Sequence, residues 1–201
     1  MTPHHRVHGV SILLELKELL GEWDGVRGLN ERTEHAVGEN LATPCIRNAR
    51  SLLVCAAGLA SHGDRDESVE LEQRVAGFGF KDWDRNLRAP RIRLALARGD
   101  RTSLEELLAI PAARGAPWYR TADIVALLDG MAALGDRAGV EELGGLFQAP
   151  GTFFEPFALR ALGITRGDTD LISRADERFR VLGLEWHASQ TDHLVHGIGR
   201  V

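Results

Sequence analysis

Apolar residues recur three to four positions apart through most of the chain, the spacing at which side chains share one face of an α-helix. In the segment 121–147, apolar residues stand at 124, 127, 128, 131 and 134, pause at Gly135 and Asp136, and resume at 140, 143 and 147. A glycine can end a helix in the left-handed conformation, and an aspartate after it can cap the next helix. The segment therefore predicts a helix, a tight corner and a second helix.

The same corner, a glycine followed by an acidic residue, occurs five times at intervals of 32 to 42 residues. The five are Gly21-Glu22, Gly63-Asp64, Gly99-Asp100, Gly135-Asp136 and Gly167-Asp168. The positions five and eight residues after each glycine are apolar in nine cases of ten, with Ser68 as the exception. Matching corners at a nearly constant period predict a repeated array of helix pairs.

The pattern also predicts where individual elements begin and end. Residues 1–7 are polar and are expected to form a flexible tail. The first helix is expected over 10–20, with its leucine-rich face inward: Ile12, Leu13, Leu16, Leu19 and Leu20. Thr43 is expected to cap the third helix and Pro44 to begin it. Connections are expected over 77–89, 111–117 and 148–152, and a closing helix over 184–195.

A period near 36 with paired helices resembles the tetratricopeptide repeat, whose unit has about 34 residues. The resemblance covers residues 8–183, although the small alanines of that repeat are here mostly Val, Leu or Ile. The segments 40–53 and 154–163 are also similar to the helical C-terminal tails of large bacterial ATPase- and cyclase-type regulators. These resemblances imply one all-α domain over residues 8–201, a tetratricopeptide-like α-solenoid of about five helix pairs with a C-terminal capping helix. They imply sensing or scaffolding rather than catalysis.

Composition narrows the choice of partners. The chain has 201 residues and a net charge of −5, so neither nucleic acid nor an acidic membrane is an expected partner. Cys45 and Cys55 fall in one predicted helix, about 15 Å apart along its axis, too far for a disulfide. Two free cysteines, together with no signal peptide and no apolar run near 18 residues, predict a cytoplasmic protein.

Signatures of catalysis and of metal binding are missing from the sequence. It has no phosphate-binding glycine loop, no paired Cys-x-x-Cys, no His-Glu-x-x-His and no nucleophile elbow. The histidines at positions 4, 5 and 8 are assigned to the flexible tail, and His193 with His196 to a solvated helix face. The paired carboxylates are assigned to helix termini and solvated faces. We therefore predict no enzymatic activity, no cofactor and no metal.

A set of polar residues on the predicted first helices is the candidate binding site, because those helices line the concave groove of tetratricopeptide-like stacks. The set is Arg47, Asn48, Arg50, Arg91, Arg93, Arg120 and Arg160. A guanidinium group can bind a carboxylate through two parallel hydrogen bonds, which suits a protein or peptide segment or a small acidic ligand. If this hypothesis holds, Arg50 and Arg93 should lie exposed on one wall. In the alternative, the arginines pair with acids on neighbouring helices and hold the stack together.

The sequence thus favours a regulatory or scaffolding interaction module. The competing hypothesis is a helical enzyme whose site is assembled from scattered residues. An open groove would favour the module, whereas an enclosed pocket lined with histidines or carboxylates of perturbed pKa would favour the enzyme.

Overall fold

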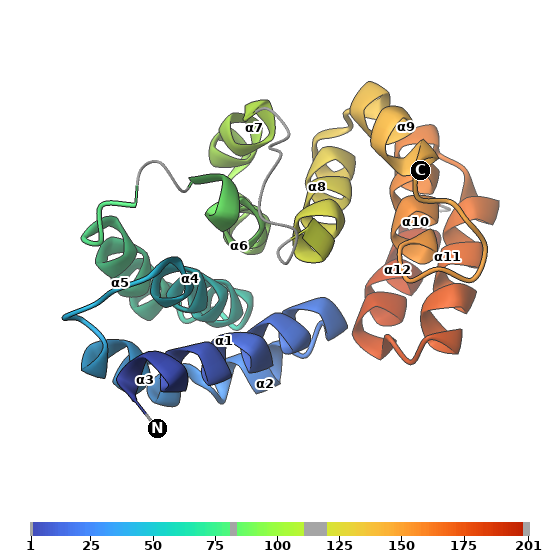
Figure 1. The fold of residues 1–201 in the computed structure, drawn as a ribbon. Helices are drawn as coiled ribbons and strands as arrows, with labels where there is room; N and C mark the ends of the chain where they lie inside the picture. The colour runs from blue at the N-terminus through green and yellow to red at the C-terminus, as the bar shows by residue number, and fades with distance from the viewer. Residues whose placement is uncertain (1, 81–83, 111–119, 199–201) are drawn as a thin grey trace. The chain divides into compact units, whose positions relative to one another are not determined.

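The computed structural model describes residues 2–80, 84–110 and 120–198, and these ranges contain twelve helices and no strand (Figure 1). The predicted all-α class is confirmed. The helices are α1 (Pro3–Leu20), α2 (Trp23–Arg27), α3 (Asn30–Glu39), α4 (Ile46–Ser61), α5 (Arg65–Ala76), α6 (Asp84–Arg98), α7 (Arg101–Ala109), α8 (Arg120–Leu134), α9 (Arg137–Gly145), α10 (Glu155–Arg166), α11 (Thr169–Val181) and α12 (Glu185–Ile198). The chain divides into two compact units, Met1–Asp123 and Ile124–Val201.

The five predicted corner glycines all adopt the left-handed conformation, with φ between 67° and 88°. They follow the ends of α1, α4, α6, α8 and α10, so their predicted role as helix terminators is confirmed. The acidic residue after the glycine caps the next helix at three of the five corners. Asp100, Asp136 and Asp168 accept backbone N–H groups of α7, α9 and α11, while Glu22 and Asp64 make no such bond.

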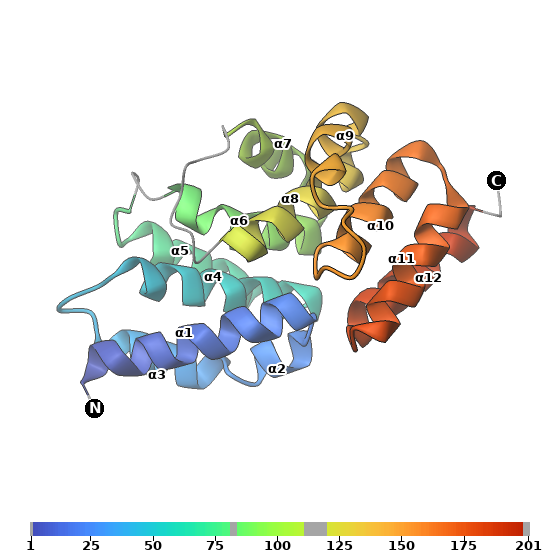
Figure 2. The same cartoon turned by 45° about the vertical axis from the view of Figure 1, so that its right-hand side comes forward.

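Helix α4 is the centre of the first unit. Thirteen of its sixteen residues are buried, because α1, α2, α3, α5 and α6 all pack against it. Figures 1 and 2 show α4 between α1 and α6. Its consecutive apolar residues Leu52, Leu53 and Val54 point to different sides of the helix and are each at most 1% exposed. A helix with apolar residues on several sides is stable in water only when neighbouring helices cover those sides, which is the arrangement found here.

The second unit is built on α10, which packs against α9 and α11, while α11 packs against α12. Its core contains a cluster of aromatic rings. The ring of Phe157 lies 4.9 Å from that of Phe179 and 4.8 Å from that of His187, measured between centroids. Both contacts are edge-to-face, the geometry that aromatic pairs prefer.

Several predicted helix starts are wrong. Residues 3–7 belong to α1 rather than to a flexible tail: the Thr2 side chain accepts the backbone N–H of His5, and Val7 is only 1% exposed. Helix α4 begins at Ile46 with Cys45 as its N-cap, not at Pro44. Helix α6 begins at Asp84, inside the predicted 77–89 connection. The predicted 111–117 loop lies outside the described residues.

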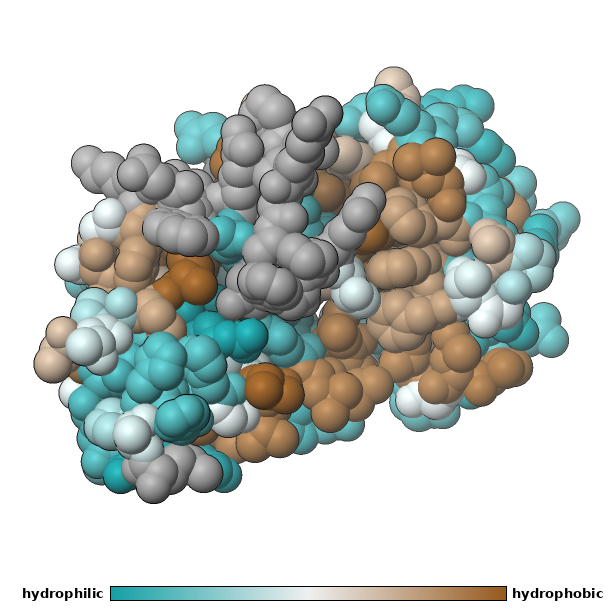
Figure 3. All heavy atoms as spheres, in the orientation of Figure 1, coloured by the Kyte–Doolittle hydropathy of each residue, from teal (hydrophilic) through white to brown (hydrophobic). Residues whose placement is uncertain are grey.

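The inward face of α1 also differs from the prediction. Ile12, Leu13 and Leu16 are instead 40–58% exposed. Figure 3 shows that hydrophobic residues reach the surface on this face of the protein. The buried positions of α1 are Val7, Val10, Ser11, Leu14 and Glu18. Two of these are polar because they face arginines of α4, whose buried guanidinium groups require hydrogen-bond partners.

Candidate binding groove and the buried arginines

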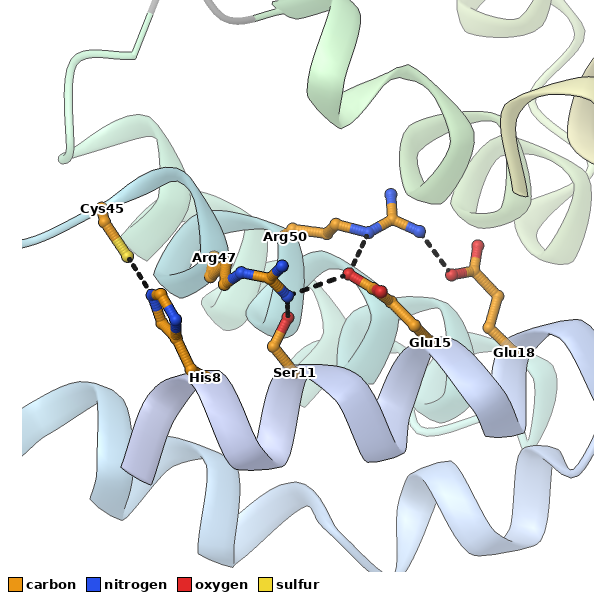
Figure 4. Close-up of polar contacts among 7 residues, drawn as sticks. All are labelled: His8, Ser11, Glu15, Glu18, Cys45, Arg47 and Arg50. Atoms are coloured by element: carbon orange, nitrogen blue, oxygen red, sulfur yellow. Dashed lines mark hydrogen bonds and ion pairs between the residues drawn. The ribbon is translucent and has the colours of Figure 1, made fainter. Parts of the chain in front are cut away.

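A polar seam lies between α1 and α4, formed by Ser11, Glu15 and Glu18 of α1 and by two of the predicted site residues of α4, Arg47 and Arg50 (Figure 4). Arg50 is 1% exposed, and its Nη2 donates to Oε2 of Glu18 at 2.8 Å. Its Nε lies 3.5 Å from Oε1 of Glu15. Burial raises the pKa of Glu15, and the charges of Arg50 and Arg47 oppose that rise. Arg50 therefore joins α1 to α4 from within the protein.

Arg47 and Asn48 serve the same seam. Nη1 of Arg47 donates to Ser11 Oγ at 3.3 Å and lies 3.4 Å from Glu15 Oε1. Asn48 is fully buried, and its Oδ1 accepts the backbone N–H of Cys45 at 3.1 Å. Asn48 thus stabilises the start of α4 from within the protein.

Arg160 has the corresponding role in the second unit. It is 5% exposed, and its Nη2 donates to Asp129 Oδ1 at 2.6 Å. Its guanidinium carbon also lies 4.9 Å from the centroid of the Phe179 ring, within the range of a cation–π contact. These contacts bind α10 to residues of α8 and α11.

The expectation that Arg50 and Arg93 lie exposed on one wall is wrong, since Arg50 is 1% and Arg93 is 8% exposed. The side chain of Arg120 lies outside the part of the chain that the structure describes. Sequence reasoning also missed a buried arginine, Arg88, because it assigned that residue to a connection. Arg88 forms a bidentate ion pair with Asp123, with Nε to Oδ1 at 2.9 Å and Nη2 to Oδ2 at 2.5 Å.

Of the predicted site residues, Arg91 lines a groove in the part of the chain that the structure describes. The groove lies in the first unit beside α5, α6 and α7 and has a volume of about 360 Å³. One side of the groove is formed by α6, through Arg91, Leu94, Ala95 and Arg98, which lie within two helical turns of one another. Leu53 of α4 contributes to the floor of the groove. The apolar part of the lining is Leu53, Val75, Ala76, Leu94, Ala95, Leu107 and Ile110. The groove is therefore flanked by α5 and α7, each the second helix of its pair. The predicted groove was instead lined by the first helix of each pair.

The charged residues of the groove include an ion pair and a capping carboxylate. Nη1 of Arg98 donates to Oε2 of Glu72 at 2.6 Å, so these two opposite charges offset each other. Asp100 accepts hydrogen bonds from the hydroxyl and backbone N–H of Ser103, which lower its pKa. Arg91 and Glu106 complete the charged residues of the lining. An apolar floor with a few charged groups is the usual composition of a binding pocket.

The lining of this groove contains no histidine or cysteine, and hydrogen bonds from Ser103 hold the pKa of its Asp100 below the usual value. No helix in the described ranges has the length and apolarity needed to cross a bilayer. No protein-family model, curated protein or solved structure matches the chain.

Proposed function

We propose that the chain is an interaction module, a tetratricopeptide-like stack of helix pairs that binds a short segment of a partner protein in the α5–α7 groove. The observation that carries the proposal is the groove itself: about 360 Å³ in volume, apolar at its floor and bordered by Arg91. This volume lies within the range of roughly 300–1,000 Å³ typical of ligand sites.

The helix packing of the first unit supports the stacked arrangement. In a stack of helix pairs, each first helix contacts its own partner and the first helix of the next pair. Helix α4 packs on its partner α5 and on the neighbouring first helices α1 and α6, and α6 packs on its partner α7. The recurring left-handed glycines give each pair the same tight corner.

The lining selects the chemistry of the ligand. Leu94, Leu107 and Ile110 offer contacts to an apolar side chain, and the guanidinium group of Arg91 offers charge-assisted hydrogen bonds to a carboxylate. A short peptide with a leucine or phenylalanine next to an acidic residue satisfies both. A small acidic ligand would use the charged groups of the lining and leave its apolar residues without a contact.

The experiment is selection from a library of short peptides that combine one acidic and one large apolar residue, followed by fluorescence anisotropy on the selected peptides. We expect Arg91→Glu to weaken binding about 10- to 100-fold, the equivalent of one hydrogen bond to a charged group. Leu107→Arg should weaken it as well, because it places a charge beside the apolar floor.

The matched control is Arg101→Glu, an arginine on α7 that is exposed and outside the groove lining. It makes the same change of charge and should leave the affinity unchanged. The proposal is wrong if the library yields no saturable binder. It is equally wrong if Arg91→Glu and Arg101→Glu bind the selected peptides alike.

A further inference from the structure

Three potential metal ligands meet where the start of α1 approaches the start of α4. His4 and His8 are one helical turn apart on α1, so their rings share one face, with centroids 4.2 Å apart. Cys45, the N-cap of α4, directs its sulfur to His8, and Sγ lies 3.8 Å from Nε2 of His8 (Figure 4). One ligand atom from each of the three residues lies within 4.8 Å of the other two.

The separation between the sulfur of Cys45 and the ring nitrogen of His8 is close to that of two ligands in a tetrahedral zinc site. With Zn–N bonds of about 2.0–2.1 Å and a Zn–S bond of about 2.3 Å, neighbouring ligand atoms stand roughly 3.3–3.6 Å apart. The observed sulfur-to-nitrogen distance of 3.8 Å exceeds this by a few tenths of an ångström. Small side-chain rotations on a helix surface would close that gap.

The surroundings prepare these residues for a metal. Asn48 holds the backbone of Cys45 in place, and its Oδ1 accepts from the thiol at 3.3 Å. All three ligand residues are half-buried, which leaves a route for an ion from solvent.

We propose that His4, His8 and Cys45 form a Zn²⁺ site with three protein ligands and a water molecule in the fourth position. Imidazole and thiolate ligands in a small cluster are the donor set that suits Zn²⁺ in proteins. On binding, the Cys45 thiol releases its proton to solvent, and its negative charge partly neutralises the ion beside Arg47. The ion would join α1 to α4 at the end of the seam opposite the Arg50–Glu18 pair.

The other cysteine does not compete for the metal. Cys55 is fully buried in α4, and burial raises its pKa to about 12, so it stays a protonated thiol at neutral pH. Any thiolate bound to an added metal at neutral pH therefore comes from Cys45. This makes the sulfur ligand directly testable by spectroscopy.

The test is titration of the metal-free, reduced protein with Zn²⁺ by calorimetry, and with Co²⁺ as a coloured substitute that accepts tetrahedral sites. We expect one bound ion per chain, a thiolate-to-cobalt absorption band and a higher melting temperature with Zn²⁺. His4→Ala, His8→Ala and Cys45→Ser should each lower the affinity by about 100-fold or more, and Cys45→Ser should abolish the band. His35→Ala, an exposed histidine outside the cluster, should change neither.

Circular dichroism of the metal-free variants checks that each one folds, so that a loss of affinity reports the ligand and not the fold. Two outcomes would overturn the proposal. One is the absence of saturable Zn²⁺ binding to the wild-type protein. The other is a Zn²⁺ affinity that is unchanged in His8→Ala or in Cys45→Ser.

Discussion

Replacing Arg50 by alanine should destabilise the protein strongly. Removing a charged residue from the surface usually costs little, but Arg50 is buried. Arg50 is 1% exposed, and its partner Glu18 is 3% exposed. The substitution removes the 2.8 Å hydrogen bond and leaves the Glu18 carboxylate inside the protein without its counter-ion. Removing one half of a buried ion pair typically costs about 3–5 kcal/mol, because the remaining charge is no longer compensated.

The assay is urea unfolding followed by circular dichroism at neutral pH, with the wild-type protein measured alongside. Arg101→Ala is the control: this arginine is 65% exposed in its side chain and pairs with Glu105 on the same helix, so its loss should cost less than about 0.5 kcal/mol. A double variant, Arg50→Met with Glu18→Leu, separates the two effects. It should recover most of the lost stability, because burying apolar groups in place of a buried pair is often neutral or stabilising.

The reasoning fails if Arg50→Ala and Arg101→Ala lose the same small amount of stability. It also fails if the double variant is less stable than Arg50→Ala by itself, since the stranded charge would then not be the cause. The first of these results would leave the ligand-binding hypothesis for Arg50 standing.

Two further predictions follow from local geometry. The ring nitrogens of His62 lie 2.7 Å from the Gly58 carbonyl oxygen and 2.7 Å from Asp24 Oδ1, and these bonds raise the pKa of His62. A raised histidine pKa stabilises the fold below its unfolded pKa of about 6.5, and this contribution is lost as the pH rises through the folded pKa. Asp24→Asn should therefore cost up to about 1 kcal/mol near pH 5 and almost nothing near pH 9 in thermal melts; equal losses at both pH values would contradict it. Gly135→Ala should lower the free energy of unfolding by roughly 1–2 kcal/mol, because the backbone φ of Gly135 is 73°. Gly38 lies in a helix with open space around it, so Gly38→Ala should be neutral or stabilising. Equal melting temperatures for the two variants would refute this prediction.

The candidate sites show where sequence reasoning reached its limit. The arginine-rich first helices were recognised from the sequence, but whether a guanidinium group meets a ligand or a carboxylate depends on the rotation of the neighbouring helix. Helix α1 turns Glu18 toward Arg50 and turns Ile12 and Leu16 outward, against the simplest interpretation of its leucine pattern. The metal-ligand cluster was overlooked for a related reason: a tail expected to be flexible is helical, and it brings His4 and His8 to Cys45.

The sequence by itself determined the helical class and the positions of the five glycine corners. Both depend on interactions within a few residues: the 3.6-residue period of an apolar face, and a backbone conformation that glycine adopts without steric cost. The tertiary structure decided which residues face one another across helices. The partners of Arg50, Arg88 and Arg160 lie 31 to 35 residues away in the sequence, and Cys45 lies 37 residues from His8. A pairing at such a separation is set by how two helices pack, and a pattern of local periodicity carries no information about it.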